Sequence, residues 1–579
     1  MSVNLKEKPY YLTDSQIAWV EKTIQGMSLE ERIQQLFFIL TAKNDEAYLK
    51  DVSENCRFGG ARYNPGKPED ILRHNKTVQK YSKLPCLIAA NTESGGNGAA
   101  RGGTEVGCGT KVGSTHDLSL AYQMGAISAI EAKQVGVNTL FAPIVDIHHD
   151  FHNPVISYKC FSSDPTEVRD MSLQFLRGVQ DNGLIACAKH FPGDGYDERD
   201  QHLAPSINPL STEEWDRSFG LVYSSLIEAG LPMIMCGHIT LPSYERKFNP
   251  TISRYLPATL SKEIVTDLLK GKLGFNGLVV TDATHMVALT SAMKRSELLP
   301  RLIAAGCDMV LFYNDYDEDM KFMMDGYKAG VFTEERLMDA LRRILGVKCL
   351  LGFDHKKKEE IIGDVDLSLF GCEKHQMVAK EVSRKGITLV KEEKGVLPIS
   401  PKKFKKVLLV PQHDDNPFTS LMPKGIPTIY DYLKKKLEAE GFEVEIFESL
   451  MDKALKMSPM EALGTISNIY NFKTPIHEMT EKYDLIIHVM DFDSHNTVQR
   501  ALWKMSKGTP DVPWYVNEIP TIMVSLRCPF HLFDAPQMKT YINCYDKNKS
   551  TIDSLVDKLT GKEEFLGVSP VDAFCVMKY

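Results

Sequence analysis

The chain lacks the features that would place it in a membrane, outside the cell or around a metal. No apolar run approaches the ~18–20 residues that a bilayer-spanning helix needs. The opening stretch MSVNLKEKPYYLTDSQ has no apolar segment before a small-residue cleavage site, so no secretory signal is predicted. The 12 cysteines include no CxxC pair, which argues against zinc and dithiol motifs. We therefore expect a cytoplasmic protein with buried, reduced thiols and no membrane partner.

The chain also has fewer basic than acidic residues. The chain has 68 Lys and Arg against 76 Asp and Glu, and the net charge of -8 gives no electrostatic case for a nucleic-acid partner. What remains is an ordinary globular composition, with 43% hydrophobic and 25% charged residues. A length of 579 residues is typical of two to four domains.

Short apolar runs alternate with longer helical patterns through residues 1–353, which is typical of repeated βα units. Near-continuous apolar strands indicate a parallel sheet that is covered on both faces. Eight such units predict a (β/α)₈ TIM barrel, although the second run has a weak strand pattern. The runs lie at 34–40, 58–64, 86–91, 139–147, 184–191, 232–238, 277–282 and 309–313.

A second α/β pattern follows a charged stretch, DHKKKEEIIGD (354–364), which we place in a linker over residues 354–372. Residues 373–579 are predicted to form an α/β sandwich domain with an open sheet. They contain neither GxGxxG nor a P-loop, and we predict no cofactor. The expected strands are 406–410, 444–447, 484–490, 521–526 and 540–545, with helices at 428–440 and 551–560.

Polar residues gather where the predicted barrel strands end. In TIM barrels the catalytic groups come from the carboxyl ends of the strands. A random scatter of polar residues would not collect there, so the pattern predicts an enzyme. The residues are Asn91, Asp146, Lys189, His190, His238 and Asp282.

The segment KHFPGDGYDERDQH (189–202) leaves the fifth strand and is dense in titratable groups. In it, Asp200 stands two residues before His202, where a carboxylate that accepts a ring N–H would fix the tautomer of the imidazole. Such a histidine can shuttle protons. Two alternatives stay open: a plain charged surface loop, and a divalent-metal site. The spacing matches no defined metal motif, so no metal is predicted.

Asp282 closes the apolar strand in GFNGLVVTDATHM (274–286). A carboxylate at the mouth of a barrel can attack an anomeric carbon as a covalent nucleophile. The alternative is a structural one, because Asp between a strand and a helix is also a favoured helix N-cap. The residues alone leave both roles open.

Together these segments resemble glycoside hydrolase family 3, in its β-N-acetylglucosaminidase (β-N-acetylhexosaminidase) branch of two-domain type. KHFPGDGYDERDQH is similar to the KHFPGHGDTxxDSH motif of that branch, and VVTD to its nucleophile motif. MSLEERIQQLF, GVNTLFAPIVDI, NPVISYKCFSSDP and GVSPVDAFC match other family segments in the right order. The resemblance covers most of the chain and implies a TIM barrel followed by an α/β sandwich.

The resemblance also implies roles for individual residues. Asp282 would be the nucleophile. His202 would act as the acid and then as the base, and Asp200 would hold its imidazole and favour the charged form. Four further residues would bind the sugar: Lys189, His190, Lys159 and Asn91. Three departures fall in these recognition elements. Asn91 replaces an Asp, Lys159 replaces an Arg whose bidentate contact Lys does not reproduce, and Asp194 with Tyr196-Asp197 replaces the HGDT core.

We therefore expect a retaining exo-glycosidase that acts on terminal β-linked N-acetylhexosamine (GlcNAc-type) residues of oligosaccharides or glycoconjugates. The alternatives are a phosphorylase of the same fold, a catalytically silent sugar-binding protein and a metal-dependent barrel hydrolase. The expectation depends on one spatial relation: the imidazole of His202 must face the carboxylate of Asp282 across a gap that holds a sugar.

Overall fold

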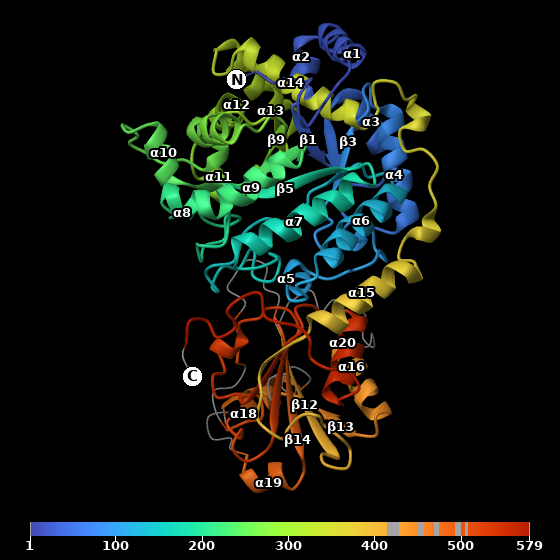
Figure 1. The fold of residues 1–579 in the computed structure, drawn as a ribbon, viewed down its shortest axis with the longest axis vertical. Coiled ribbons are helices and arrows are strands. Elements are labelled where there is room, and N and C mark those ends of the chain that lie inside the picture. The colour runs from blue at the N-terminus through green and yellow to red at the C-terminus, as the bar shows by residue number, and fades with distance from the viewer. Residues whose placement is uncertain are drawn as a thin grey trace. The chain divides into compact units, whose positions relative to one another are not determined.

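The computed structural model describes residues 2–413, 428–449, 453, 457–467, 474–492, 500–503 and 508–577 (Figure 1). The chain divides into two compact units. The first comprises Met1–Gly109 and Asp117–Val378, and the second comprises Thr110–His116 and Ala379–Tyr579. The short excursion of Thr110–His116 into the second unit is a feature that no sequence pattern indicated. Within the described residues, no helix is long and apolar enough to cross a bilayer.

The first unit is built on a closed barrel of eight parallel strands, as predicted. Parallel pairing of Phe37 in the first strand with Val310 in the last closes the ring. The weak second run forms a strand of only three residues, which nevertheless pairs with both neighbours. Around the barrel the strands follow the order β1-β10-β9-β7-β5-β4-β3-β2. Their bounds are β1 (Phe37–Leu40), β2 (Gly60–Arg62), β3 (Leu87–Ala90), β4 (Thr139–Leu140), β5 (Ile185–Phe191), β7 (Met233–Cys236), β9 (Leu278–Ala283) and β10 (Met309–Leu311).

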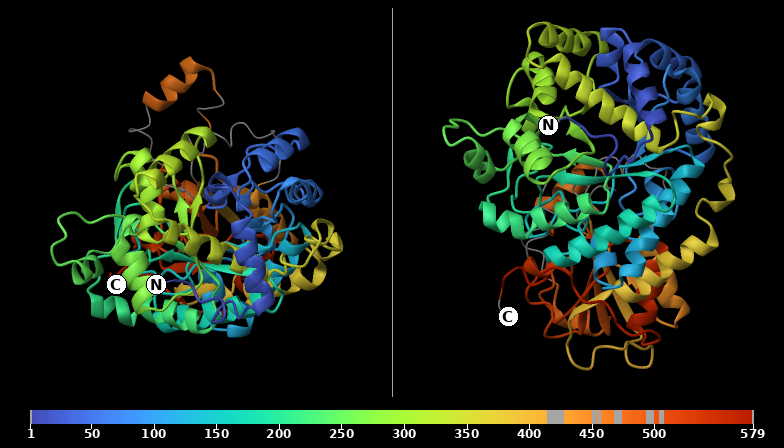
Figure 2. Two further views of the ribbon diagram at one scale, coloured as in Figure 1. Left: turned by 90° about the horizontal axis from the view of Figure 1, so that it is seen from above. Right: turned by 45° about the horizontal axis from the view of Figure 1, so that its top comes forward.

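Helices surround these strands (Figure 2). Among them, the side chain of Asp164 caps α7, which has Pro in its first turn, and Ser211 forms a capping box on α8. Their bounds are α1 (Asp14–Gln25), α2 (Leu29–Gln34), α3 (Glu46–Asn55), α4 (Pro68–Tyr81), α6 (Leu118–Gln134), α7 (Pro165–Gln180), α8 (Thr212–Arg217), α9 (Phe219–Glu228), α10 (Pro242–Phe248), a π-helix (Glu263–Lys272), α11 (Val287–Thr290), α12 (Arg295–Ala305), α13 (Tyr316–Lys328) and α14 (Glu334–Leu350).

Large apolar side chains fill the inside of the barrel. The rings of Phe38 and Phe141 lie 5.7 Å apart, and Cys187, Met233 and Val280 are fully buried in the same core. A packed interior of this kind leaves no pore. Any cavity at the carboxyl ends of the strands therefore has a closed floor.

The second unit contains a six-stranded sheet in the order β11-β16-β15-β14-β12-β13. All five predicted strands are present and parallel, and an antiparallel edge strand, β11 (Thr388–Lys391), adds to them. The parallel strands are β12 (Lys406–His413), β13 (Glu443–Ile446), β14 (Leu485–Asp491), β15 (Thr521–Ser525) and β16 (Thr540–Asn543). The helices are α16 (Ile429–Ala439), α18 (Pro459–Ser467), α19 (Ile476–Thr480) and α20 (Lys549–Leu559), while α5 (Gly109–Gly113) and α15 (Glu373–Gly386) each lie across a boundary between units.

Candidate active site

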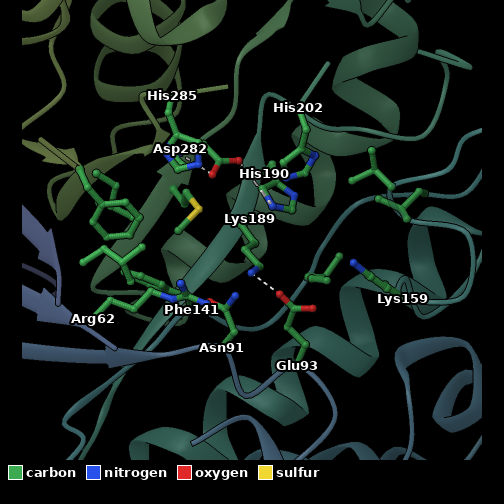
Figure 3. A pocket seen from close by; sticks show the side chains of 18 residues that line it. Arg62, Asn91, Glu93, Phe141, Lys159, Lys189, His190, His202, Asp282 and His285 are labelled. Carbon is green, nitrogen blue, oxygen red and sulfur yellow. Dashed lines mark hydrogen bonds and ion pairs between the residues drawn. The ribbon is translucent and has the colours of Figure 1, made fainter. Parts of the chain in front are cut away.

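A cavity of about 300 Å³ opens at the carboxyl ends of the barrel strands (Figure 3). Nearly every strand or the loop that follows it contributes a lining residue, so the closed sheet itself sets the shape of the cavity. The polar residues that line it are Arg62, Asn91, Glu93, Lys159, Lys189, His190, His202, Asp282 and His285. Apolar side chains, including Phe141, Met235 and Leu311, form the floor.

The carboxylate of Asp282 projects into the cavity from β9 (Figure 3). Its Oδ1 accepts a hydrogen bond of 2.7 Å from the main-chain N–H of Ala283, which fixes the carboxylate. Burial raises the pKa of this carboxyl, but the positive field of His190, joined by His238, outweighs burial and lowers the pKa below its usual value. Asp282 is therefore held as an anion, the form that a nucleophile needs.

His190 stands beside Asp282, with 3.9 Å between its Nε2 and Oδ2 of the carboxylate. On its other side, Nδ1 lies 2.8 Å from Oδ2 of Asp146, which is fully buried. Burial lowers the pKa of the imidazole, but the charge and hydrogen bond of Asp146 more than compensate, so that the pKa is raised. The pair thus places positive charge next to Asp282.

A second carboxylate–imidazole pair joins Asp200 and His202. Nδ1 of His202 lies 2.6 Å from Oδ1 of Asp200, and the main-chain N–H of His202 donates to the same oxygen. The carboxylate is buried, while about half of the imidazole is exposed and lines the cavity. The ring therefore has one nitrogen fixed by Asp200 and the other free to exchange a proton with a ligand in the cavity.

Several cationic side chains lie close together on the opposite wall of the cavity. Lys189 forms an ion pair with Glu93 (Figure 3). Burial raises the pKa of the Glu93 carboxyl, but Lys189 and Lys159 together lower it to about 2. Arg62, at the end of β2, is largely buried, and burial lowers its pKa. These groups offer N–H donors and a carboxylate to the hydroxyls of a bound sugar.

The sequence of the barrel matches the model of the glycosyl hydrolase family 3 N-terminal domain over residues 28–347, more than half of the chain. The chain belongs to glycosyl hydrolase family 3. As a member of this family, it is a glycoside-cleaving enzyme.

Two relatives of this family 3 enzyme match it from end to end. A β-N-acetylglucosaminidase/β-glucosidase of Cellulomonas fimi is 37% identical over 577 residues, which are 99% of each chain. The solved structure of a β-glucoside phosphorylase, BglX, bound to 2FGlc is 36% identical, with a TM-score of 0.90 and 99% coverage of both chains. A family 3 β-N-acetylglucosaminidase from Paenibacillus sp. str. FPU-7 shares the fold, with a TM-score of 0.76 at 23% identity over 95% of this chain and 100% of the other.

In the family 3 enzyme, six of the seven predicted site residues line one cavity. The seventh, Asp200, is buried behind His202 and touches the cavity through it. His202 and Asp282 line the same cavity, so they lie at the same end of the barrel, as the sequence interpretation required. The predicted residues that line the cavity are Asn91, Lys159, Lys189, His190, His202 and Asp282.

Sequence reasoning missed three polar residues of the cavity. Glu93 lies in the NTESGG segment, where attention went to Asn91. Arg62 ends the weak second strand, and His285 follows Asp282 by three residues. A rule that inspects the last residue of each barrel strand and the three residues after it finds all three on the strands of the structure.

Proposed function

We propose that this enzyme is a retaining exo-glycosidase that removes terminal β-linked N-acetylhexosamine from oligosaccharides or glycoconjugates. The observation that carries the proposal is the placement of an ionised carboxylate, Asp282, and a carboxylate-bound imidazole, His202, on one cavity. A covalent route needs both an anion that attacks the anomeric carbon and a group that first donates and then removes a proton.

The steps follow from the groups present. His202 donates its Nε2 proton to the leaving oxygen while Asp282 attacks the anomeric carbon, and a glycosyl-enzyme ester results. Neutral His202 then takes a proton from water, which attacks the anomeric carbon, breaks its bond to the carboxylate oxygen of Asp282 and releases the sugar with retained configuration. Asp200 stabilises the imidazolium form, which donates its proton in the first step and is restored by the second.

The closed floor and small volume of the cavity support exo action. Phe141, Met235 and Leu311 line its inner end, so a sugar chain cannot pass through the barrel, and the volume of about 300 Å³ fits the terminal part of a chain. The relatives support the choice of sugar: one has the name β-N-acetylglucosaminidase/β-glucosidase, and a Pseudoalteromonas piscicida β-hexosaminidase A is 28% identical over 341 residues. Glucosides are therefore the competing substrates to test.

A panel of nitrophenyl β-glycosides (GlcNAc, GalNAc, glucose and xylose) tests the sugar. We expect the highest kcat/KM with GlcNAc, and a preference for another sugar would refute that part of the proposal. An activated fluorosugar should label Asp282, as mass spectrometry of peptides would show. Asp282→Asn should abolish both labelling and turnover, and labelling of a different residue would refute the mechanism.

Phosphorolysis is a second candidate, in which inorganic phosphate replaces water as the acceptor. The cavity carries three permanent cations, on Arg62, Lys159 and Lys189, against the carboxylates of Glu93 and Asp282. Its proposed acid/base is an imidazole, which repels phosphate less than a carboxylate would. A solved relative is also named a β-glucoside phosphorylase. Product analysis in phosphate buffer separates the two reactions, because phosphorolysis yields a glycosyl phosphate and hydrolysis yields the free sugar.

A further inference from the structure

A buried carboxylate, Asp194, lies on the loop that carries His202 but does not line the cavity. It is 2% exposed and accepts three hydrogen bonds. Oδ1 accepts from the side-chain amide of Asn153 at 2.8 Å and from the N–H of Gly195 at 2.7 Å, and Oδ2 accepts from the amide of Gln201 at 3.2 Å. The carboxylate thus joins the segment after β4 to the residue before His202.

Gln201 extends this connection to the neighbouring strand of the barrel. Its side chain is fully buried, with Nε2 donating to Asp194 and Oε1 accepting from the main-chain N–H of His238 at 2.9 Å. His238 follows β7, so one amide ties the loop to both β5 and β7. The amide can satisfy both partners in only one orientation, because the opposite one would face its NH₂ towards the N–H of His238.

The main chain of the same two residues is also held. The carbonyl of His202 accepts from the N–H of Val287 at 3.0 Å, and the carbonyl of Gln201 accepts from Ala288 at 3.3 Å. Val287 and Ala288 begin α11, the helix that follows Asp282. The position of His202 relative to Asp282 therefore depends on the position and orientation of Gln201.

We propose that Asp194 is a positioning residue for the acid/base step: it orients Gln201, and thereby holds the imidazole of His202 in reach of the leaving oxygen. The inference rests on the proposed function of His202. In the resembling family motif a histidine stands at the position of Asp194.

The ionised carboxyl is the form that fits these contacts, because all three partners are N–H donors. Two titratable groups act on it through their charge, Asp146 and His190. Burial and the charge of Asp146 raise the pKa of Asp194 to about 7, against the lowering effect of His190. Asp197 and His238 are linked to it through main-chain atoms, by way of Asn153 and Gln201. Assays above neutral pH therefore examine the ionised state.

Asp194→Asn keeps the size of the side chain but turns an NH₂ group towards one of the N–H donors. We expect kcat/KM, which reports the step that releases the leaving group, to fall about 10- to 100-fold on an alkyl β-glycoside, the range for a lost hydrogen bond to a buried charge. On a dinitrophenyl glycoside, whose departure needs no acid, the fall in kcat/KM should stay below about 3-fold. Equal losses on both substrates would overturn the proposal, because a general structural defect does not discriminate between leaving groups.

Glu245→Gln is the matched control. Glu245 is also a fully buried carboxyl, and burial raises its pKa to about 7, but it lies outside the cavity lining. Any loss of activity in this control variant should be the same on the alkyl glycoside and on the dinitrophenyl glycoside. Gln201→Met supplies a second variant should Asp194→Asn fail to fold, and we expect it to show the same selective loss on the alkyl glycoside.

A double-mutant cycle distinguishes failure of this inference from failure of the proposed function. On the alkyl glycoside, Asp194→Asn should cost almost nothing further once His202→Ala is present, because both changes remove the same step. Full additivity would overturn the role of Asp194. If His202→Ala alone shows no dependence on the leaving group, the proposed acid/base role of His202 falls first.

Discussion

Replacing Asp146 with asparagine removes a negative charge that acts on the proposed nucleophile, Asp282, through His190. Asp146 is buried beneath His190, and the amide oxygen of the variant can still accept from the N–H groups of His190 and Asp194 that the carboxylate now binds. The geometry should persist while the charge is lost. Without that charge the pKa of His190 falls, because burial, which lowers it, is no longer compensated.

The size of the effect follows from the distance between the two side chains. Nε2 of His190 lies 3.9 Å from Oδ2 of Asp282, and the side chains are 12% and 14% exposed. Unit charges at this separation interact by about 4 kcal/mol at an effective dielectric constant of ~20 and by about 1 kcal/mol in bulk water. At ~1.4 kcal/mol per unit, the pKa of Asp282 should rise by about 1–3 units in Asp146→Asn.

The rise in the pKa of Asp282 determines the direction of the pH effect. Asp282 must be ionised to attack, so a higher pKa makes activity disappear at a higher pH as the solution is acidified. The acid limb of kcat/KM, which reports ionisations of the free enzyme, should move up by about 1–3 pH units on an activated N-acetylglucosaminide. Activity well above the limb should fall less.

Asp150→Asn provides the control. Asp150 forms a similar pair with Nδ1 of His152 at 2.9 Å, but neither residue lines the cavity. Its acid limb should match that of the parent enzyme. If folded Asp146→Asn also keeps the parental limb, then the charge on His190 does not hold Asp282 ionised, and our account of the nucleophile's electrostatics is refuted.

Three further changes test other parts of the molecule. Lys111→Met should lower the free energy of unfolding by about 3–5 kcal/mol, because the buried carboxylate of Asp546 loses the ammonium group that lies 2.9 Å away. Thermal melts measure this loss. The double variant Lys111→Met/Asp546→Leu should recover part of it, since neither charge is then left buried alone. Glu93→Gln should raise KM about 10-fold in initial-rate kinetics, since Lys189 loses the anion that orients it; an unchanged KM would remove that pair from sugar binding. Burial raises the pKa of Glu245 to about 7, so the folded protein keeps a proton that the unfolded chain loses above about pH 4. The free energy of unfolding should therefore fall as the pH rises from about 4 to about 7, and Glu245→Gln should remove up to about 3 kcal/mol of that decline in urea titrations.

The barrel could be predicted from the sequence because each of its strands is an apolar run bounded by helical patterns. Even β2, which has only three residues, is among the eight predicted runs, although its strand pattern is weak. The edge strand β11 was missed. Its four residues are mostly half-buried and alternate weakly, as is usual where only one side of a strand is paired.

The candidate site was predicted to the extent that its contacts are local or follow from barrel geometry. Asp200 and His202 are two residues apart, so their hydrogen bond could be anticipated from spacing. The partners of Asp146 and Glu93 could not, because they lie 44 and 96 residues away along the chain. Only the closed order of the strands brings such residues together.

The proposed nucleophile and the proposed acid/base come from different kinds of backbone. Asp282 and Lys189 lie on strands that are paired on both sides, whereas His202 lies on a surface loop. In the proposed mechanism the group that activates the acceptor therefore lies where a substitution unpairs no strand, whereas the nucleophile lies where a substitution disturbs the pairing of the barrel. The two steps of that mechanism depend on separate parts of the backbone.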